Sequence, residues 1–220
     1  MLEHHLLTPR AARYVTLGAP ASEATEVWFA LHGYGQLAPR FAHRLTGLDT
    51  GQRTVVVPEG LSRFYVDVHR GTVGASWMTR EERTCEIDDY VRYLEAVATD
   101  VLPSPAAPPV HVLGFSQGSA TACRWVERGT VRPQRVLLWG GEVPPDLDWS
   151  RAASRFQDVE VVLVAGDRDE FATEAALTRH ADVLSEHGVA SRVVRYPGGH
   201  SIDPTILRDL AGTPKRGLTS

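Results

Sequence analysis

The sequence predicts an α/β fold built around one mostly parallel sheet. Apolar runs rich in β-branched residues recur along the chain, and segments whose apolar residues are three and four apart lie between them. Several of these runs are apolar without alternation, as in residues 161–164, which is typical of strands buried on both faces of a parallel sheet. Strands that alternate with helices favour a sheet covered by helices on both faces.

Seven runs are predicted to be strands: Tyr14–Leu17, Val27–Leu31, Thr54–Val57, Val110–Leu113, Arg135–Trp139, Val159–Ala165 and Arg192–Tyr196. Helical spacing occurs in Ile87–Ala98 and Ala176–Leu184, and a third helix is predicted to end at Arg128. Gly188 stands where a glycine ends a helix, and Pro204 where a proline begins one. Ligands of such sheets bind beyond the carboxyl ends of the strands, so we expect the chemistry there.

The composition excludes several classes of protein. The 220 residues are 43% hydrophobic and 23% charged, which argues against disorder and favours a single domain over residues 1–220. A net charge of −4 provides no basic surface for nucleic acid or for stable membrane association. No apolar run approaches the ~18 residues of a membrane helix, and no signal-peptide core is present. We therefore expect a cytoplasmic protein.

The most informative motif is Gly114-Phe115-Ser116-Gln117-Gly118, which lies between a strand-like run and a helix-like segment. A G-x-S-x-G motif in this context is typical of a nucleophile elbow. The turn is so tight that Ser116 is expected in a strained backbone conformation, with no room for a Cβ at Gly114 or Gly118. The alternative is a chance match in a glycine-containing loop, and the strand–turn–helix context favours the nucleophile.

A serine hydroxyl needs a general base, and the base needs an acid that orients it. With this type of turn, the order along the chain is serine, acid, histidine. Three histidines follow Ser116. His180 and His187 lie in or next to a helix-like segment, where a place on the helix surface explains them. His200 follows a strand-like run and a flexible Pro-Gly-Gly loop, and it is the predicted base.

The acid is expected just after the strand-like run that ends at Ala165. Asp169 occupies that position and is the predicted acid. Asp167 is the competitor, although an aspartate directly after a glycine often hydrogen-bonds only its own turn. Asp203 follows the predicted base and is better explained as a helix cap before Pro204.

An acyl-transfer site also needs two backbone N–H groups that face the developing oxyanion. One is expected from Gln117, the residue after the nucleophile. The other is expected from Tyr34, because glycines at positions 33 and 35 allow the loop to turn its amides toward a ligand. His32 begins this loop, and we interpret it as a structural residue that hydrogen-bonds the loop rather than as a base.

In order and spacing, four motifs resemble the phospholipase/carboxylesterase family of α/β-hydrolases, which includes acyl-protein thioesterases and small bacterial carboxylesterases. The motifs are His32-Gly33-Tyr34-Gly35, Gly114-Phe115-Ser116-Gln117-Gly118, Gly166-Asp167-Arg168-Asp169 and Gly199-His200. The resemblance spans Val27 to Leu210 and implies a twisted sheet of about seven strands without a large lid domain. It implies the triad Ser116, Asp169 and His200, with Tyr34 and Gln117 as oxyanion donors.

The chain departs from this resemblance at two places. Gln36 stands where the thioesterases usually carry an aspartate after H-G-x-G. Residues 170–173 read Glu-Phe-Ala-Thr, where the family tends to have Val-Pro shortly after the catalytic aspartate.

The segment Leu61–Cys85 is rich in aromatic and basic residues. Its large apolar side chains are Phe64, Tyr65, Trp77 and Met78, and its arginines are Arg63, Arg70, Arg80 and Arg83. Two interpretations remain open: the aromatic residues form walls of an acyl or aryl pocket, or the segment is a packed loop with surface arginines.

These observations predict a serine hydrolase that cleaves carboxylic esters of short-to-medium acyl chains through an acyl-enzyme intermediate. The expected partner is a small-molecule ester, and no cofactor or metal is expected, because no motif for either is present. A thioesterase or lysophospholipase with the same triad is the alternative. From another class, a catalytically silent α/β-hydrolase that serves as a binding module is the rival.

Overall fold

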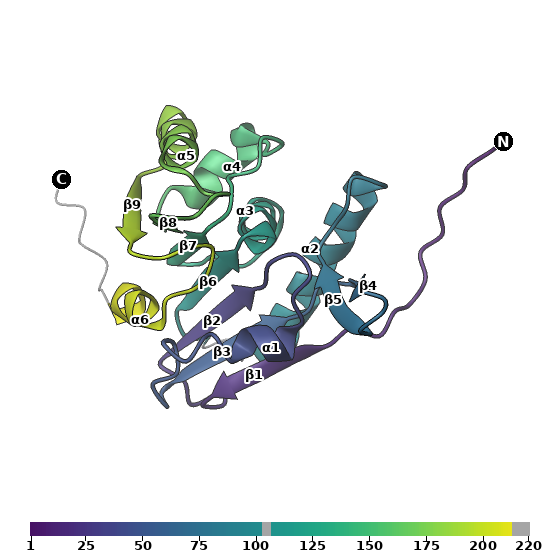
Figure 1. Cartoon of the computed structure of the whole chain (residues 1–220), viewed down its shortest axis with the longest axis horizontal. Coiled ribbons are helices and arrows are strands. Elements are labelled where there is room, and N and C mark those ends of the chain that lie inside the picture. Colours follow the sequence, from purple (N-terminus) through teal and green to yellow (C-terminus); the bar gives the residue numbers. More distant parts are fainter. Residues whose placement is uncertain (103–106, 213–220) are drawn as a thin grey trace.

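The computed structural model describes residues 1–102 and 107–212. Seven strands form the central sheet in the order β1-β3-β2-β6-β7-β8-β9 (Figure 1). Their bounds are β1 Tyr14–Gly18, β2 Glu26–Leu31, β3 Arg53–Pro58, β6 Val110–Phe115, β7 Arg135–Trp139, β8 Glu160–Gly166 and β9 Ser191–Tyr196. Every neighbouring pair is parallel except β1 and β3. The predicted mostly parallel sheet of about seven strands is confirmed.

Helices cover both faces of this sheet. Their bounds are α1 Ala38–Ala42, α2 Arg83–Val101, α3 Gln117–Arg128, α4 Trp149–Phe156, α5 Glu174–Glu186 and α6 Pro204–Gly212. One apolar cluster joins α2, α3, α4 and α5 to the sheet, and a second joins α1 and α6 to it. Residues of β2 alternate between the clusters: Phe29 belongs to the first and Trp28 to the second. The apolar runs without alternation are therefore strands buried on both faces.

The helix boundaries agree with the signals in the sequence. Pro204 is the first residue of α6, and the carboxylate of Asp203 accepts hydrogen bonds from the N–H groups of Thr205 and Ile206 at 2.8 and 3.0 Å. Gly188 follows α5 with a φ of 74°, which glycine adopts without strain. None of the helices in the described ranges combines the length and the apolar character that a bilayer span requires.

The segment after β3 forms an antiparallel hairpin of β4 (Ser62–Asp67) and β5 (Thr72–Ser76), which the sequence did not predict. Exposure alternates along the first half of β4, so Phe64 and Tyr65 lie on opposite faces of the hairpin. An isolated bridge between Gln36 and Ala75 joins the hairpin to the loop after β2.

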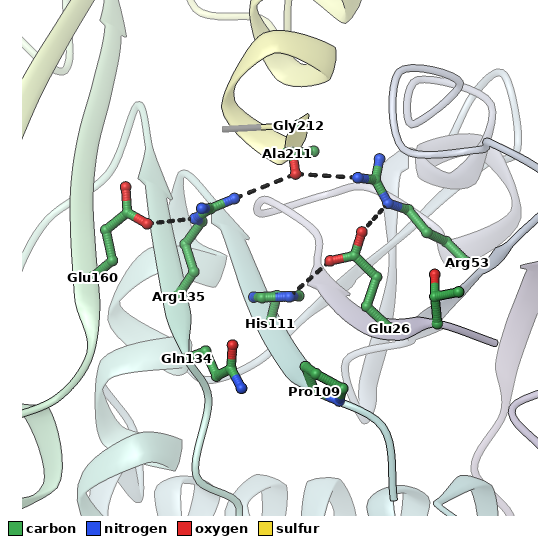
Figure 2. Close-up of a pocket in the computed structure, with 10 residues that line it drawn as sticks. Glu26, Arg53, Pro109, His111, Gln134, Arg135, Glu160, Ala211 and Gly212 are labelled. Atoms are coloured by element: carbon green, nitrogen blue, oxygen red, sulfur yellow. Dashed lines mark hydrogen bonds and ion pairs between the residues drawn. The ribbon is translucent and has the colours of Figure 1, made fainter. Parts of the chain in front are cut away.

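At the amino edge of the sheet, two arginines hold the end of α6. Figure 2 shows Arg53 and Arg135 on either side of the Ala211 carbonyl, to which they donate at 3.1 and 3.3 Å. Arg135 also donates to the Leu210 carbonyl at 2.7 Å and pairs with Glu160 at 2.8 Å. Cationic groups at a helix C-terminus satisfy its last carbonyls and oppose its dipole, so these arginines fix α6 to the sheet.

A histidine and a glutamate complete this edge. Glu26 pairs with Arg53, and its second carboxylate oxygen lies 2.8 Å from Nε2 of His111 (Figure 2). Burial would raise the pKa of Glu26, but hydrogen bonds with His111 and Arg53 outweigh it and lower the pKa to about 2. These side chains line a pocket of about 350 Å³, and its charged groups are paired with one another.

Candidate active site

Ser116 lies on a sharp turn between β6 and α3. Its φ of 53° and ψ of −118° are strained for a residue with a Cβ. The turn allows nothing larger than glycine two residues before or after it: a Cβ at Gly114 would lie 2.4 Å from the Gly118 carbonyl oxygen, and one at Gly118 would lie 2.1 Å from that of Leu31. The half-buried Ser116 thus has the geometry expected of a nucleophile elbow.

Asp169 and His200 form a hydrogen-bonded pair. His200 Nδ1 lies 2.8 Å from Oδ2 of Asp169, whose side chain is buried. The other carboxylate oxygen accepts from the backbone N–H groups of Phe171 and Ala172 at 2.9 and 3.0 Å. These three contacts fix the carboxylate, and the bond at Nδ1 leaves Nε2 of His200 as the nitrogen that can exchange a proton with a substrate.

The topology brings this pair to the same edge of the sheet as Ser116. Asp169 follows β8, His200 follows β9 and Ser116 follows β6, and these strands run in parallel, so their carboxyl ends lie together. The ring of His200 lies 4.9 Å, centroid to centroid, from the ring of Phe115. A Cβ at Gly140, just after β7, would lie 3.1 Å from both Asp169 and His200.

The other candidates for the acid and the base make different contacts. Asp167 is exposed and pairs with Arg195 at 2.9 Å, not with a histidine. The ring of His187 stacks on Trp149 at 4.2 Å. His180 lies half-buried on α5. Of the three histidines that follow Ser116, His200 is therefore the one with a carboxylate at its ring nitrogen.

The loop after β2 has a defined hydrogen-bond pattern. The N–H of Gly33 donates to the side-chain oxygen of Gln36 at 2.8 Å, and the N–H of Gly35 donates to the Ala75 carbonyl at 2.9 Å. Among the described residues, the backbone N–H of Tyr34 between them has no acceptor. Gln117 is the first residue of α3, where a backbone N–H has no partner within the helix. Within the described part of the chain, neither predicted oxyanion donor thus has a backbone acceptor.

His32 supports this loop through hydrogen bonds, the structural role that its position at the start of the loop predicts. Its Nε2 accepts from the N–H of Gly60 at 2.9 Å, and its Nδ1 donates to the Gly33 carbonyl at 2.8 Å. Burial lowers the pKa of His32 to about 4, so the ring is neutral at pH 7 and suits both bonds.

The side chain of Gln117 joins the nucleophile turn to the end of the hairpin. It accepts from the Trp77 N–H at 3.1 Å and donates to the Met78 carbonyl at 2.8 Å. It also exchanges hydrogen bonds with the hydroxyl of Ser76. These contacts fix the start of α3 and therefore the direction of the Gln117 backbone N–H.

The four predicted pocket residues separate in the structure. Phe64 is half-buried, with its ring 5.0 Å from that of Tyr34 in the oxyanion loop. Tyr65 is exposed on the other face of the hairpin, and Met78 packs partly buried against the core. Trp77 is 1% exposed, and its indole nitrogen donates to the His32 carbonyl at 2.8 Å. Trp77 is therefore a core residue with no free face for an acyl chain beside Ser116.

Three contributors to the site did not emerge from the sequence motifs. Gln36 is a departure from the family pattern, yet its side-chain oxygen accepts a hydrogen bond from the Gly33 N–H. Gly140 leaves room for the histidine and its acid. Phe171, in the other departure, lies with its ring 4.9 Å from that of His200. In the sequence, Gln36 and Phe171 stand out only as departures from the family pattern. Neither departure indicates which residue the side chain contacts.

Fold and site together define an α/β-hydrolase. Residues 13–213 match the phospholipase/carboxylesterase family, and the chain belongs to that family. A comparison with curated protein sequences finds no significant match.

Solved structures support the fold. Acyl-protein thioesterase 2 of Zea mays aligns with a TM-score of 0.69 and 18% identity over 91% of this chain and 96% of that chain. A phospholipase/carboxylesterase from Dyadobacter fermentans aligns with a TM-score of 0.65 and 14% identity over 93% and 98% of the two chains. The Bacillus cereus carboxylesterase aligns with a TM-score of 0.64 and 15% identity over 91% and 92%.

Proposed function

We propose that the protein is a serine hydrolase that cleaves carboxylic esters through an acyl-enzyme, with Ser116 as nucleophile, His200 as base and Asp169 as orienting acid. The observation that carries this proposal is the strained turn at Ser116 on the edge of the sheet where His200 is hydrogen-bonded to a buried aspartate. Membership of the phospholipase/carboxylesterase family supports the same reaction class.

In the proposed mechanism, the Ser116 Oγ attacks the ester carbonyl while His200 Nε2 takes the hydroxyl proton. The backbone N–H groups of Tyr34 and Gln117 bind the tetrahedral oxyanion. His200 then gives the proton to the leaving alcohol oxygen as the C–O bond breaks. Water then attacks the acyl carbonyl as His200 Nε2 takes one of its protons. When the second tetrahedral intermediate collapses, the bond between the acyl carbon and Ser116 Oγ breaks, His200 returns the proton to Oγ, and the carboxylic acid leaves.

Asp169 holds the imidazole in the tautomer with its proton on Nδ1 and stabilises the imidazolium that forms. Its fixed position supports this role, because one oxygen accepts from two backbone N–H groups while the other faces His200. The carboxylate therefore needs no rearrangement during turnover.

The proposed substrates have short-to-medium acyl chains. Phe64, beside the oxyanion loop, is the pocket residue whose position best suits contact with an acyl group, whereas Tyr65 and Met78 are more peripheral. Each buried CH₂ contributes about 0.8 kcal/mol, so efficiency should rise over the shortest acyl chains and then level off once the chain extends beyond the protein surface. A steady rise to palmitoyl esters would instead favour a lysophospholipase or thioesterase.

The experiment is a panel of p-nitrophenyl esters, acyl-CoAs and lysophospholipids assayed with the wild type and with Ser116→Ala. We expect ester hydrolysis by the wild type and a kcat lower by roughly 10⁴- to 10⁶-fold in a folded Ser116→Ala variant. A variant that retains a tenth of the wild-type activity would contradict the nucleophile assignment. Absence of hydrolysis across the panel would favour the silent binding module.

A further inference from the structure

Phe171 is an aromatic residue on the surface directly beside the proposed base. Its side chain belongs to the most exposed large apolar groups of the described residues, with a relative exposure of 77%. The ring nevertheless contacts His200, at 4.9 Å between centroids and an interplanar angle of 56°. Two aromatic rings therefore contact the His200 imidazole: that of Phe171 is exposed, and that of Phe115 is buried.

The proposed acid holds the backbone that carries this ring. The backbone N–H of Phe171 donates to Oδ1 of Asp169 at 2.9 Å, and the same oxygen accepts from Ala172, which is buried. The carboxylate that orients His200 thus also anchors the backbone of Phe171. A phenyl ring held in water beside the base has most of its apolar surface available to a bound substrate.

The chemistry of the reaction determines which part of the substrate lies there. His200 must give its proton to the leaving oxygen, so this oxygen lies within hydrogen-bond reach of the imidazole in the transition state. Any group attached to that oxygen must extend past His200 and its neighbours. The acyl group is attached to the carbonyl carbon instead, near the oxyanion loop with Tyr34 and Phe64.

We propose that Phe171 is a specificity-determining residue that binds the alcohol half of the ester and selects substrates whose leaving group carries an aromatic ring. This inference rests on the proposed function, because it requires His200 to be the base. Aromatic pairs prefer offset or edge-to-face contacts with centroids 4.5–7 Å apart, and a ring held beside the leaving oxygen can form such a contact.

Benzyl acetate and methyl acetate provide the test. Their alcohols have similar acidity, so leaving-group chemistry contributes little to a difference between them. Both esters form the same acetyl-enzyme, so a difference in kcat/KM reports only the acylation step, in which the alcohol is still bound. We expect the wild type to prefer benzyl acetate, and Phe171→Ala to lower the benzyl-to-methyl ratio of kcat/KM by about 3- to 10-fold.

Three further variants sharpen the test. Phe171→Tyr should keep the ratio, because the aromatic ring is retained. Phe64→Ala should change the preference among acyl chains but not the benzyl-to-methyl ratio. Val193→Ala removes an exposed apolar side chain on β9 and should change neither. Thermal unfolding of each variant shows whether it is folded.

The proposal is overturned if Phe171→Ala lowers kcat/KM equally for both acetates, because the ring would then only shield His200 from water. It is also overturned if the ratio is unchanged while ester hydrolysis is normal, and in that case the proposed function stands. If the wild type hydrolyses neither acetate and a fluorophosphonate does not label Ser116, the proposed function fails together with this inference.

Discussion

The two edges of the central sheet each place a histidine beside a carboxylate at the same distance. At the carboxyl edge, Nδ1 of His200 lies 2.8 Å from Asp169, and at the amino edge, Nε2 of His111 lies 2.8 Å from Glu26. The surroundings differ. His200 is half-buried on the edge that carries the strained Ser116, whereas His111 is buried beside charged groups that are already paired.

The comparison shows that a short histidine–carboxylate distance does not by itself define a catalytic pair. At the amino edge, Glu26 and Arg53 satisfy each other, and the arginines hold the end of α6. At the carboxyl edge, the side chains of Gln36 and Gln117 hydrogen-bond backbone groups of the loop after β2 and of the hairpin end. The N–H of Tyr34 has no acceptor among the residues that the structure describes. We therefore assign stability to the amino edge and chemistry to the carboxyl edge.

The largest expected effect is on kcat, and it distinguishes the carboxylate of Asp169 from that of Glu26. Asp169→Asn should lower kcat by roughly 10⁴-fold, because an amide no longer selects the correct tautomer of His200. Glu26→Gln, the matched change at the other edge, should leave kcat within about twofold and lower stability instead. Asp167→Asn changes the alternative acid two residues earlier in the chain, and it should affect mainly the local turn. If Asp167→Asn inactivates and Asp169→Asn does not, the acid has been misassigned.

The second effect concerns stability at the amino edge. Arg135→Ala leaves Glu160 without this partner and removes the bonds to the Leu210 and Ala211 carbonyls. Removing one member of a buried ion pair costs about 3–5 kcal/mol, so the free energy of unfolding should fall by that order. Urea denaturation measures the loss, and kcat of the folded fraction should change little. A large loss of kcat in fully folded Arg135→Ala would mean that the two edges are coupled.

The smallest effect is a pair of pH dependences in separate windows. The pKa of His32 falls from 6.5 to about 4 on folding, so the unfolded chain binds the extra proton between these values. Stability should therefore decrease as the pH falls from 6.5 to 4, by a total on the order of 3 kcal/mol. The pKa of Glu26 falls from 4.5 to about 2, so its contribution is lost only as the pH falls through that lower window.

Urea denaturation at a series of pH values separates the contribution of His32 to stability from that of Glu26. His32→Gln should flatten the decrease between pH 6.5 and 4, and Glu26→Gln should flatten the decrease below pH 4.5. An NMR titration in which the His32 ring protonates near pH 6.5 in the folded protein would contradict the first assignment.

The sequence was most informative where a local constraint determines the structure. The requirement for glycine on both sides of Ser116 follows from the turn itself, and the observed crowding at Gly114 and Gly118 agrees with it. The strands buried on both faces were also predictable, because burial removes alternation from the sequence. The boundaries at Pro204 and Gly188 follow from backbone conformation in the same way.

What could not be predicted depends on contacts between distant parts of the chain. The contact of Phe171 with His200 requires the loops after β8 and β9 to be placed relative to each other. The burial of Trp77 depends on the hairpin and on its bond to the His32 carbonyl, 45 residues away. The strands of the hairpin are short, Gly74 lies inside β5, and the register shifts between Tyr65 and Asp67, all of which weaken the period-two pattern.

Active-site labelling tests the assignment of chemistry to the carboxyl edge most directly. The protein is treated with a fluorophosphonate, digested and analysed by mass spectrometry, beside Ser116→Ala, His200→Ala and Glu26→Gln. We predict one adduct on Ser116 in the wild type and in Glu26→Gln, no adduct in Ser116→Ala, and slow labelling in His200→Ala, because only an activated serine reacts readily. A wild type that remains unlabelled, or is labelled at another residue, would contradict the assignment.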